Sequence, residues 1–172
     1  MQKVTTHDGS ETFLNVEVNE SYHSYTGAGE EAREKFCKPA GIKALAQKGS
    51  FRLLDVCFGM GYNSAMAISI ALQENPDCKI EVVGLENDPK ILEKIQEVNP
   101  AIPFFEHYKK LSSKSLEFTH ENVNVKVLLG DAHTTVKELH DDSFDVVFYD
   151  PFSPKTAPCL WCEELFQEMY RV

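Results

Sequence analysis

The sequence predicts an α/β fold in which a parallel sheet is covered by helices on both faces. From residue 51 onward, strand-like and helix-like segments alternate, and this alternation is typical of parallel strands joined by crossover helices. The strand candidates, all rich in Val, Leu, Ile or Phe, span residues 51–57, 79–85, 124–129 and 144–149. The helix candidates that follow them span residues 62–74, 89–98, 133–140 and 160–171.

Length and charge limit the function. A chain of 172 residues is long enough to bury a substantial core. Its net charge of −10 opposes binding of nucleic acid through phosphate neutralisation, so a nucleic-acid substrate would need a local basic patch or residues outside this chain. No run approaches the ~18 apolar residues of a membrane helix. The N-terminus has no apolar signal-peptide core, so a cytoplasmic protein without membrane contact is expected.

Residues 1–50 differ from the remainder and are predicted to be an N-terminal extension that packs on a core formed by residues 51–172. Asp8-Gly9 is a strong hairpin signal between two short strand-like runs. A loop of small residues and tyrosines follows at 21–29, where it is able to reach a ligand of the main sheet. A helix is expected to begin near Glu30, and Pro39 either ends it or opens a second helix.

Four strands are fewer than doubly wound sheets usually contain. The chain reaches Val172 within a predicted helix, after which another strand would be expected. The final strands are therefore predicted to be missing, and the core to be incomplete at its C-terminus. Residues 100–122 are expected to form a less regular insertion.

A glycine-rich turn follows the first of these strands. Asp55 precedes Gly59 and Gly61 by four and six residues, and Asn63 opens the next helix. The dinucleotide pattern is not met, because Ser64 stands where its third glycine would be. This spacing lets a carboxylate meet a cationic amino-acid group while the glycines admit a nucleoside. A tight strand–helix connection formed for packing alone is a common alternative.

The second strand ends at Glu86, 25 residues after Gly61. An acid near this spacing suits the hydroxyl groups of a ribose, because a carboxylate accepts two hydrogen bonds from a vicinal diol. A solvated acid at a strand end is the alternative. Asn87 and Asp88 come next and are typical of a helix cap.

Acidic residues also follow the third and fourth strands. Asp131, with Ala132 beside it, is placed either to accept the exocyclic amine of an adenine or to cap a helix. Asp150 lies at the sheet edge where ligands bind in open α/β folds, and the prolines around Phe152 make its loop rigid. This segment could align an amine beside an electrophilic methyl group, although a rigid turn without chemistry is also possible.

The five cysteines are an odd number in a chain expected to be intracellular, so reduced thiols are predicted. Cys159 and Cys162 have the spacing of a redox pair or of half a zinc site. A second such pair, or paired histidines, is lacking, so free thiols are favoured and no metal is predicted.

Together these positions resemble the class I S-adenosylmethionine-dependent methyltransferases, which have a Rossmann-like fold. More closely, the chain is similar to the methyltransferase domain of the MnmC-type enzymes, which methylate aminomethyl-uridine at the tRNA wobble position. The stretches that carry the resemblance are Asp8-Gly9-Ser10, Tyr25-Thr-Gly27, Glu30-Glu31-Ala32-Arg33, residues 54–63, residues 142–145, and residues 150–155 with Pro158 and Trp161. Cys57 and Pro151 depart from the family pattern, which prefers glycine at both positions.

The resemblance implies a tRNA-modifying methyltransferase that uses S-adenosylmethionine, with tRNA as partner and no flavin oxidase module in this chain. It implies that Asp150 is catalytic and that Phe152 and Lys155 bind substrate. The cofactor-binding residues that it implies are Tyr25, Gly27, Asp55, Gly59, Gly61, Asn63, Glu86, Asn87, Asp131 and Ala132.

Other functions remain open on the sequence. An aminopropyltransferase of the spermidine-synthase type would suit an acidic protein, and a non-catalytic cofactor-binding protein is a further alternative. For tRNA contact, Lys109, Lys110 and Lys114 with the aromatic residues Phe104, Phe105 and Tyr108 are candidates. An ordinary solvated insertion explains this segment at least as well.

Overall fold

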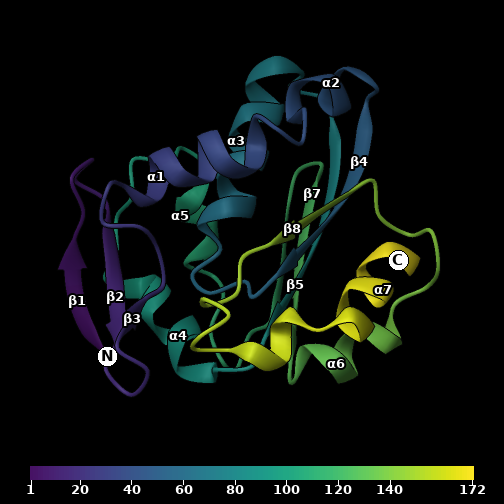
Figure 1. Cartoon of the computed structure of the whole chain (residues 1–172). Helices are drawn as coiled ribbons and strands as arrows, with labels where there is room; N and C mark the ends of the chain where they lie inside the picture. Colours follow the sequence, from purple (N-terminus) through teal and green to yellow (C-terminus); the bar gives the residue numbers. More distant parts are fainter.

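A five-stranded sheet forms the centre of the computed structural model, which describes residues 1–172 (Figure 1). Its strand order is β6-β7-β5-β4-β8. The strands are β4 (Ser50–Val56), β5 (Lys79–Glu86), β6 (Glu117–His120), β7 (Val123–Leu129) and β8 (Val146–Tyr149). Four of them are parallel, and β6 pairs antiparallel with β7. The predicted parallel sheet is confirmed for β4, β5, β7 and β8, and β6 adds an antiparallel strand that was not predicted.

The additional strand β6 has a local cause. Glu121 adopts a left-handed conformation with φ of 50°, and the tight turn that it forms with Asn122 returns the chain directly along β7. A short turn of this kind joins antiparallel strands, whereas parallel strands need a long crossover. Only Phe118 of the four β6 residues is apolar, so the sequence carried little strand signal.

Helices cover both faces of the sheet, as predicted (Figure 1). One face is covered by α1 (Ala28–Glu31), the π-helix η1 (Ala32–Cys37), α2 (Ile42–Gln47), α3 (Tyr62–Glu74), α4 (Pro89–Lys94) with η2 (Ile95–Glu97), and α5 (Phe105–Tyr108). The other face is covered by α6 (Ala132–Thr135) with η3 (Val136–Glu138), and by η4 (Pro158–Trp161) with α7 (Glu163–Arg171). Along β4, Leu53 packs into the first cluster while Leu54 and Val56 pack into the second, as the alternation of strand side chains requires.

The N-terminal segment forms a separate antiparallel sheet of β1 (Gln2–Thr5), β2 (Glu11–Asn15) and β3 (Glu20–Ser21). The hairpin predicted at Asp8-Gly9 is confirmed, and Gly9 has the positive φ of 81° that favours glycine. Phe13 of β2 belongs to the same hydrophobic cluster as Leu53 of the central sheet. The two parts therefore share one hydrophobic core. The domain boundary at residue 50 stays a prediction from the sequence.

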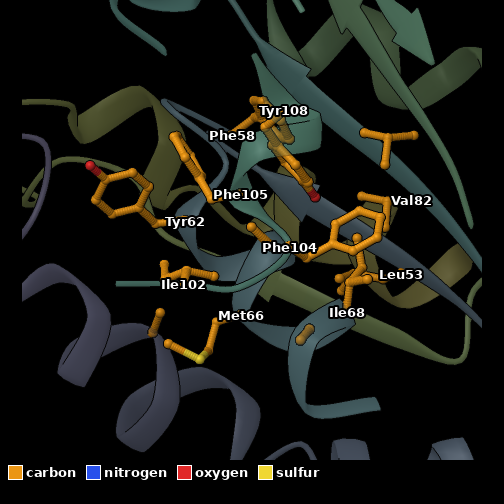
Figure 2. Packing of buried hydrophobic residues seen from close by; sticks show 14 of the residues in the cluster. Leu53, Phe58, Tyr62, Met66, Ile68, Val82, Ile102, Phe104, Phe105 and Tyr108 are labelled. Carbon is orange, nitrogen blue, oxygen red and sulfur yellow. The ribbon is translucent and has the colours of Figure 1, made fainter. Parts of the chain in front are cut away.

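Residues 100–122 contribute to the core, although a less regular insertion was predicted there. Phe104, Phe105 and Tyr108 are buried, and the Tyr108 ring stacks on Phe58 with a centroid distance of 6.0 Å (Figure 2). Gly84 permits this packing, because a Cβ there would lie 2.4 Å from the Phe58 ring. Because these rings are buried, they do not form the candidate surface for tRNA contact.

No helix of the chain is long and apolar enough to span a membrane.

Candidate functional site

A cavity of about 720 Å³ opens at the carboxyl ends of β4, β5, β7 and β8, where open α/β sheets bind ligands. The loops after these strands line it together with residues of the N-terminal segment. Its size is within the range of small-molecule sites. Six carboxylates line it and no Lys or Arg does: Glu20, Glu31, Glu86, Asp88, Asp131 and Asp150. The cavity therefore favours a cationic ligand.

The glycine-rich turn after β4 is held in a left-handed conformation. Cys57, Gly59 and Gly61 have φ values of 63°, 57° and 76°. Gly59 lines the cavity, whereas Gly61 packs in the core, where a Cβ would lie 2.5 Å from the Tyr108 ring. Cys57 thus occupies a backbone conformation that normally favours glycine.

Glu86 connects this turn to the start of α4. One carboxylate oxygen accepts the backbone N–H of Gly59 at 2.7 Å, and the other accepts those of Asn87 and Asp88 at 2.8 Å each. Burial raises the pKa of Glu86, although these three hydrogen bonds oppose the change. Glu86 and Asn87 both line the cavity, and Asp88 is the N-cap of α4 as predicted.

Asp150 follows β8 and is bound to the first turn of α3. Nδ2 of Asn63 donates to Oδ2 of Asp150 at 2.9 Å. Burial raises the pKa of Asp150 to about 6, while the hydrogen bond from Asn63 lowers it. Phe152, two residues later, packs against Tyr22 of the N-terminal segment with a centroid distance of 5.0 Å. All four residues line the cavity.

Asp55 is fully buried and its two carboxylate oxygens make no hydrogen bond. Burial raises its pKa to about 7, and the nearby charges of Asp150 and Glu86 act in the same direction. Its side chain lies near Ser64 of α3, outside the residues that line the cavity. A buried acid without a partner is costly unless it is neutral or meets a cation.

Asp131 has the capping role considered for it, and its role in adenine binding stays a prediction. It is the N-cap of α6 and accepts the backbone N–H of His133 at 2.8 Å, and it also lines the cavity next to Ala132.

Two other predicted residues lie elsewhere. Gly27 is outside the cavity, and a Cβ there would lie 2.4 Å from the carboxyl group of Asp8. Its neighbour Tyr25 does line the cavity, with half of its surface exposed. Lys155 is exposed on the loop after Phe152 and does not line the cavity. The binding roles of these residues stay predictions.

The structure also reveals a contact that sequence reasoning missed. The Glu20 carboxylate accepts the backbone N–H of Ser153 at 2.8 Å and its hydroxyl at 3.0 Å, across 133 residues of sequence. It ties β3 to the loop that carries Phe152. Glu31 of α1 also lines the cavity and accepts the backbone N–H of Ser24 at 2.7 Å. No local sequence pattern marks Glu20, because its partner Ser153 is distant in the sequence. None marks Glu31 either, because its partner Ser24 lies in an irregular loop.

Comparison with known proteins places this architecture in a family. A model of S-adenosyl-L-methionine-dependent methyltransferases matches residues 95–172. The crystal structure of MnmC2 from Aquifex aeolicus is similar over the whole fold, with a TM-score of 0.85 and 31% identity, covering 99% of this chain and 56% of that chain. The chain has the fold of the class I S-adenosylmethionine-dependent methyltransferases.

Two curated proteins are similar to this chain over most of its length. An uncharacterised protein of Methanocaldococcus jannaschii, MJ0670, is 32% identical over 98% of this chain and 46% of its own length. The tRNA 5-methylaminomethyl-2-thiouridine biosynthesis bifunctional protein MnmC of Dichelobacter nodosus is 28% identical over 89% of this chain and 25% of its own length. The chain thus spans less than half the length of these two relatives.

The residues of the cavity fit S-adenosylmethionine as the cofactor of this methyltransferase domain. Its sulfonium and ammonium groups are cationic and suit a cavity lined by carboxylates alone among the charged residues. Glu86 at the end of β5 is available at the glycine turn, and the unpartnered Asp55 lies close to the same turn.

Proposed function

We propose that this methyltransferase domain transfers the methyl group of S-adenosylmethionine to an amino group, and that this amine is the aminomethyl group of a modified wobble uridine in tRNA. The observation that carries the proposal is Asp150, held by Asn63 at the edge of a cavity lined by carboxylates and by no Lys or Arg. The similarity to MnmC of Dichelobacter nodosus, whose name specifies tRNA methylaminomethyl-thiouridine biosynthesis, supports tRNA as the acceptor.

Asp150 acts on the acceptor amine in this proposal. Its pKa of about 6 leaves the carboxylate mostly ionised at neutral pH. Asn63 engages Oδ2, so Oδ1 is free to accept an N–H of the amine, orient its lone pair and take up the proton that is lost. Methyl transfer from a sulfonium is an in-line displacement, so the remaining task of the protein is to position the two reactants and to exclude water.

The other side chains bind in this scheme. Glu86 accepts the ribose hydroxyls, while Asp131 with Ala132 receives the adenine. Asp55 lies behind the glycine turn and supplies a negative charge for the methionine end of the cofactor. The loop at Tyr25 also reaches towards this end. Support comes from the lining of the cavity by four of these residues and from the burial of Asp55.

Lys155 is the proposed contact to RNA, because it is exposed beside the loop of Phe152. The other basic candidates are less suitable: Lys109 forms an ion pair with Glu106 at 2.7 Å, and Lys110 lies over the Phe118 ring at 5.7 Å. With a net charge of −10, the chain offers few sites for phosphate.

The test offers different acceptors to one protein preparation. Labelled S-adenosylmethionine is supplied with tRNA that carries aminomethyl-uridine, or with matched tRNA that carries unmodified uridine. Label in the first tRNA alone is the expected result. Label in neither tRNA, despite calorimetric binding of the cofactor, would favour a non-catalytic binding protein. Aminopropyl transfer from decarboxylated cofactor to putrescine would instead favour the aminopropyltransferase alternative.

A further inference from the structure

A second cluster of reactive side chains lies at the rim of the cavity, between α6 and the start of α7. Sγ of Cys162 lies 3.5 Å from Nε2 of His133, and Nδ1 of the same ring lies 2.9 Å from Oδ1 of Asp131. The three groups therefore form a continuous thiol–imidazole–carboxylate array. Neither Cys162 nor His133 has a role in the methyl transfer proposed above.

The contacts of Asp131 determine where the protons lie. Its carboxylate only accepts hydrogen bonds, so the hydrogen between it and the His133 ring belongs to Nδ1. In the neutral ring Nε2 is then an acceptor, and the Cys162 thiol donates to it. The backbone N–H of His133 donates to the same oxygen at 2.8 Å, which keeps the carboxylate and the ring aligned. Transfer of the thiol proton to Nε2 gives a thiolate beside an imidazolium that Asp131 stabilises.

Some groups around the Cys162 thiol favour a thiolate and others oppose it. Cys162 is the N-cap of α7, and the positive end of this nine-residue helix stabilises a thiolate. The exposed Glu164 opposes a thiolate by its charge, and its own backbone N–H lowers the pKa of its carboxyl. Tyr149 also packs nearby, and burial and the neighbouring thiols raise the pKa of its phenol, which is therefore neutral.

We propose that Cys162 is a nucleophilic modification site for soft electrophiles, peroxides among them, with His133 as its base and Asp131 as the group that orients the base. With hydrogen peroxide, the S–O bond forms as the O–O bond breaks. Hydroxide leaves with the bonding electrons and takes the proton from His133, giving water. The sulfur is oxidised by two electrons to a sulfenic acid and the peroxide is reduced.

Cys159 provides an internal comparison within the same segment. It is exposed and hydrogen-bonds to no side chain, whereas Cys162 is only partly exposed. If accessibility alone determined the reaction, Cys159 would react faster. The thiol–imidazole–carboxylate array predicts the opposite order.

The experiment is competitive alkylation of the full chain by limiting iodoacetamide, with each cysteine peptide quantified by mass spectrometry. At about pH 6.5, Cys162 is expected to be labelled about tenfold faster than Cys159, because His133 is in place to accept the thiol proton. His133→Asn should remove this advantage. The matched control His140→Asn, at an exposed histidine outside the array, should retain it. Equal or faster labelling of Cys159 in the wild type, or an unchanged rate at Cys162 in His133→Asn, overturns the proposal.

If His133→Asn fails to fold, the pH profile of cysteine labelling in the wild-type chain tests the proposal instead. Labelling of Cys159 is expected to fall steeply as the pH is lowered, while labelling of Cys162 persists to lower pH because His133 accepts the thiol proton. Two superimposable profiles would overturn the proposal. Because neither measurement depends on methyl transfer, failure of the proposed enzymatic function leaves this test intact.

Discussion

Nδ2 of Asn63 donates to Oδ2 of Asp150 at 2.9 Å, which joins the first turn of α3 to the loop after β8 across 87 residues of sequence. The two residues lie on either side of the glycine turn and both line the cavity. This hydrogen bond fixes one oxygen of the proposed catalytic carboxylate and leaves the other free. It also lowers the pKa of Asp150 against the larger effect of burial.

Asn63→Ala should therefore shift the pH dependence of methyl transfer. In the wild type, Asp150 with its pKa of about 6 becomes active as it loses its proton, so the rate rises with pH through about 6. Without the Asn63 amide the charged form loses a hydrogen bond, so the pKa rises further and the acidic limb moves to higher pH. Single-turnover rates between about pH 5 and 8 measure this shift. A limb that stays in place or moves to lower pH would contradict the role given to Asn63.

Glu20→Ala should reduce turnover by about tenfold, because misplacing a substrate-positioning loop is costly even when the chemistry is intact. The carboxylate holds both the N–H and the hydroxyl of Ser153. Glu20→Gln keeps an acceptor for the N–H and offers a donor to the hydroxyl, so it should largely restore turnover. Steady-state kinetics of both variants provide the measurement, and equal losses in the two would point to the charge of Glu20 instead of its hydrogen bonds.

Asp55→Asn should stabilise the cofactor-free protein at high pH. Burial raises the pKa of Asp55 to about 7 in the folded state, above its unfolded value. The folded state then binds more protons, so stability is lost as pH rises from about 4 to 7, and the cost above pH 7 is on the order of 4 kcal/mol. The neutral amide avoids this cost. Urea unfolding should show a clearly larger gain at about pH 8 than at about pH 5; a variant that is less stable at both would contradict the account.

Cys57→Gly should be more stable than Cys57→Ala by about 1 kcal/mol, which reverses the usual order of the two residues. The reason is the left-handed backbone at Cys57, with φ of 63°, which disfavours any residue with a Cβ. Both variants lose the same thiol, so the difference isolates the backbone effect. Thermal unfolding of the pair, side by side, provides the comparison, and a more stable alanine variant would be evidence against a left-handed turn at this position.

The sequence could predict the cavity because its acids stand at the carboxyl ends of strands. Glu86 ends β5, while Asp131 and Asp150 follow β7 and β8, and parallel strands bring their carboxyl ends to one edge of the sheet. The strand pattern places these residues without any knowledge of contacts between distant segments. The same reasoning could not determine whether the Asp55 side chain lies in the cavity or behind the glycine turn. The spacing of Asp55 to the glycines fits both positions.

The features that were missed depend on contacts between distant segments. The contact of Glu20 with Ser153 has no local signal, and neither has the packing of Tyr108 on Phe58. The aromatic residues near Lys109 were first interpreted as an RNA surface because basic and aromatic residues alternate there. Burial of those rings in the core follows from α5 packing against α3, which a single sequence does not reveal.

Asp150→Asn tests the central claim most directly, since it keeps the size of the side chain and removes its negative charge and its ability to take a proton. The measurement pairs single-turnover methyl transfer to an amine acceptor with calorimetric affinity for S-adenosylhomocysteine. We predict a loss of rate by about 10²- to 10⁴-fold with cofactor affinity unchanged within about twofold. Turnover at the wild-type rate would contradict the account.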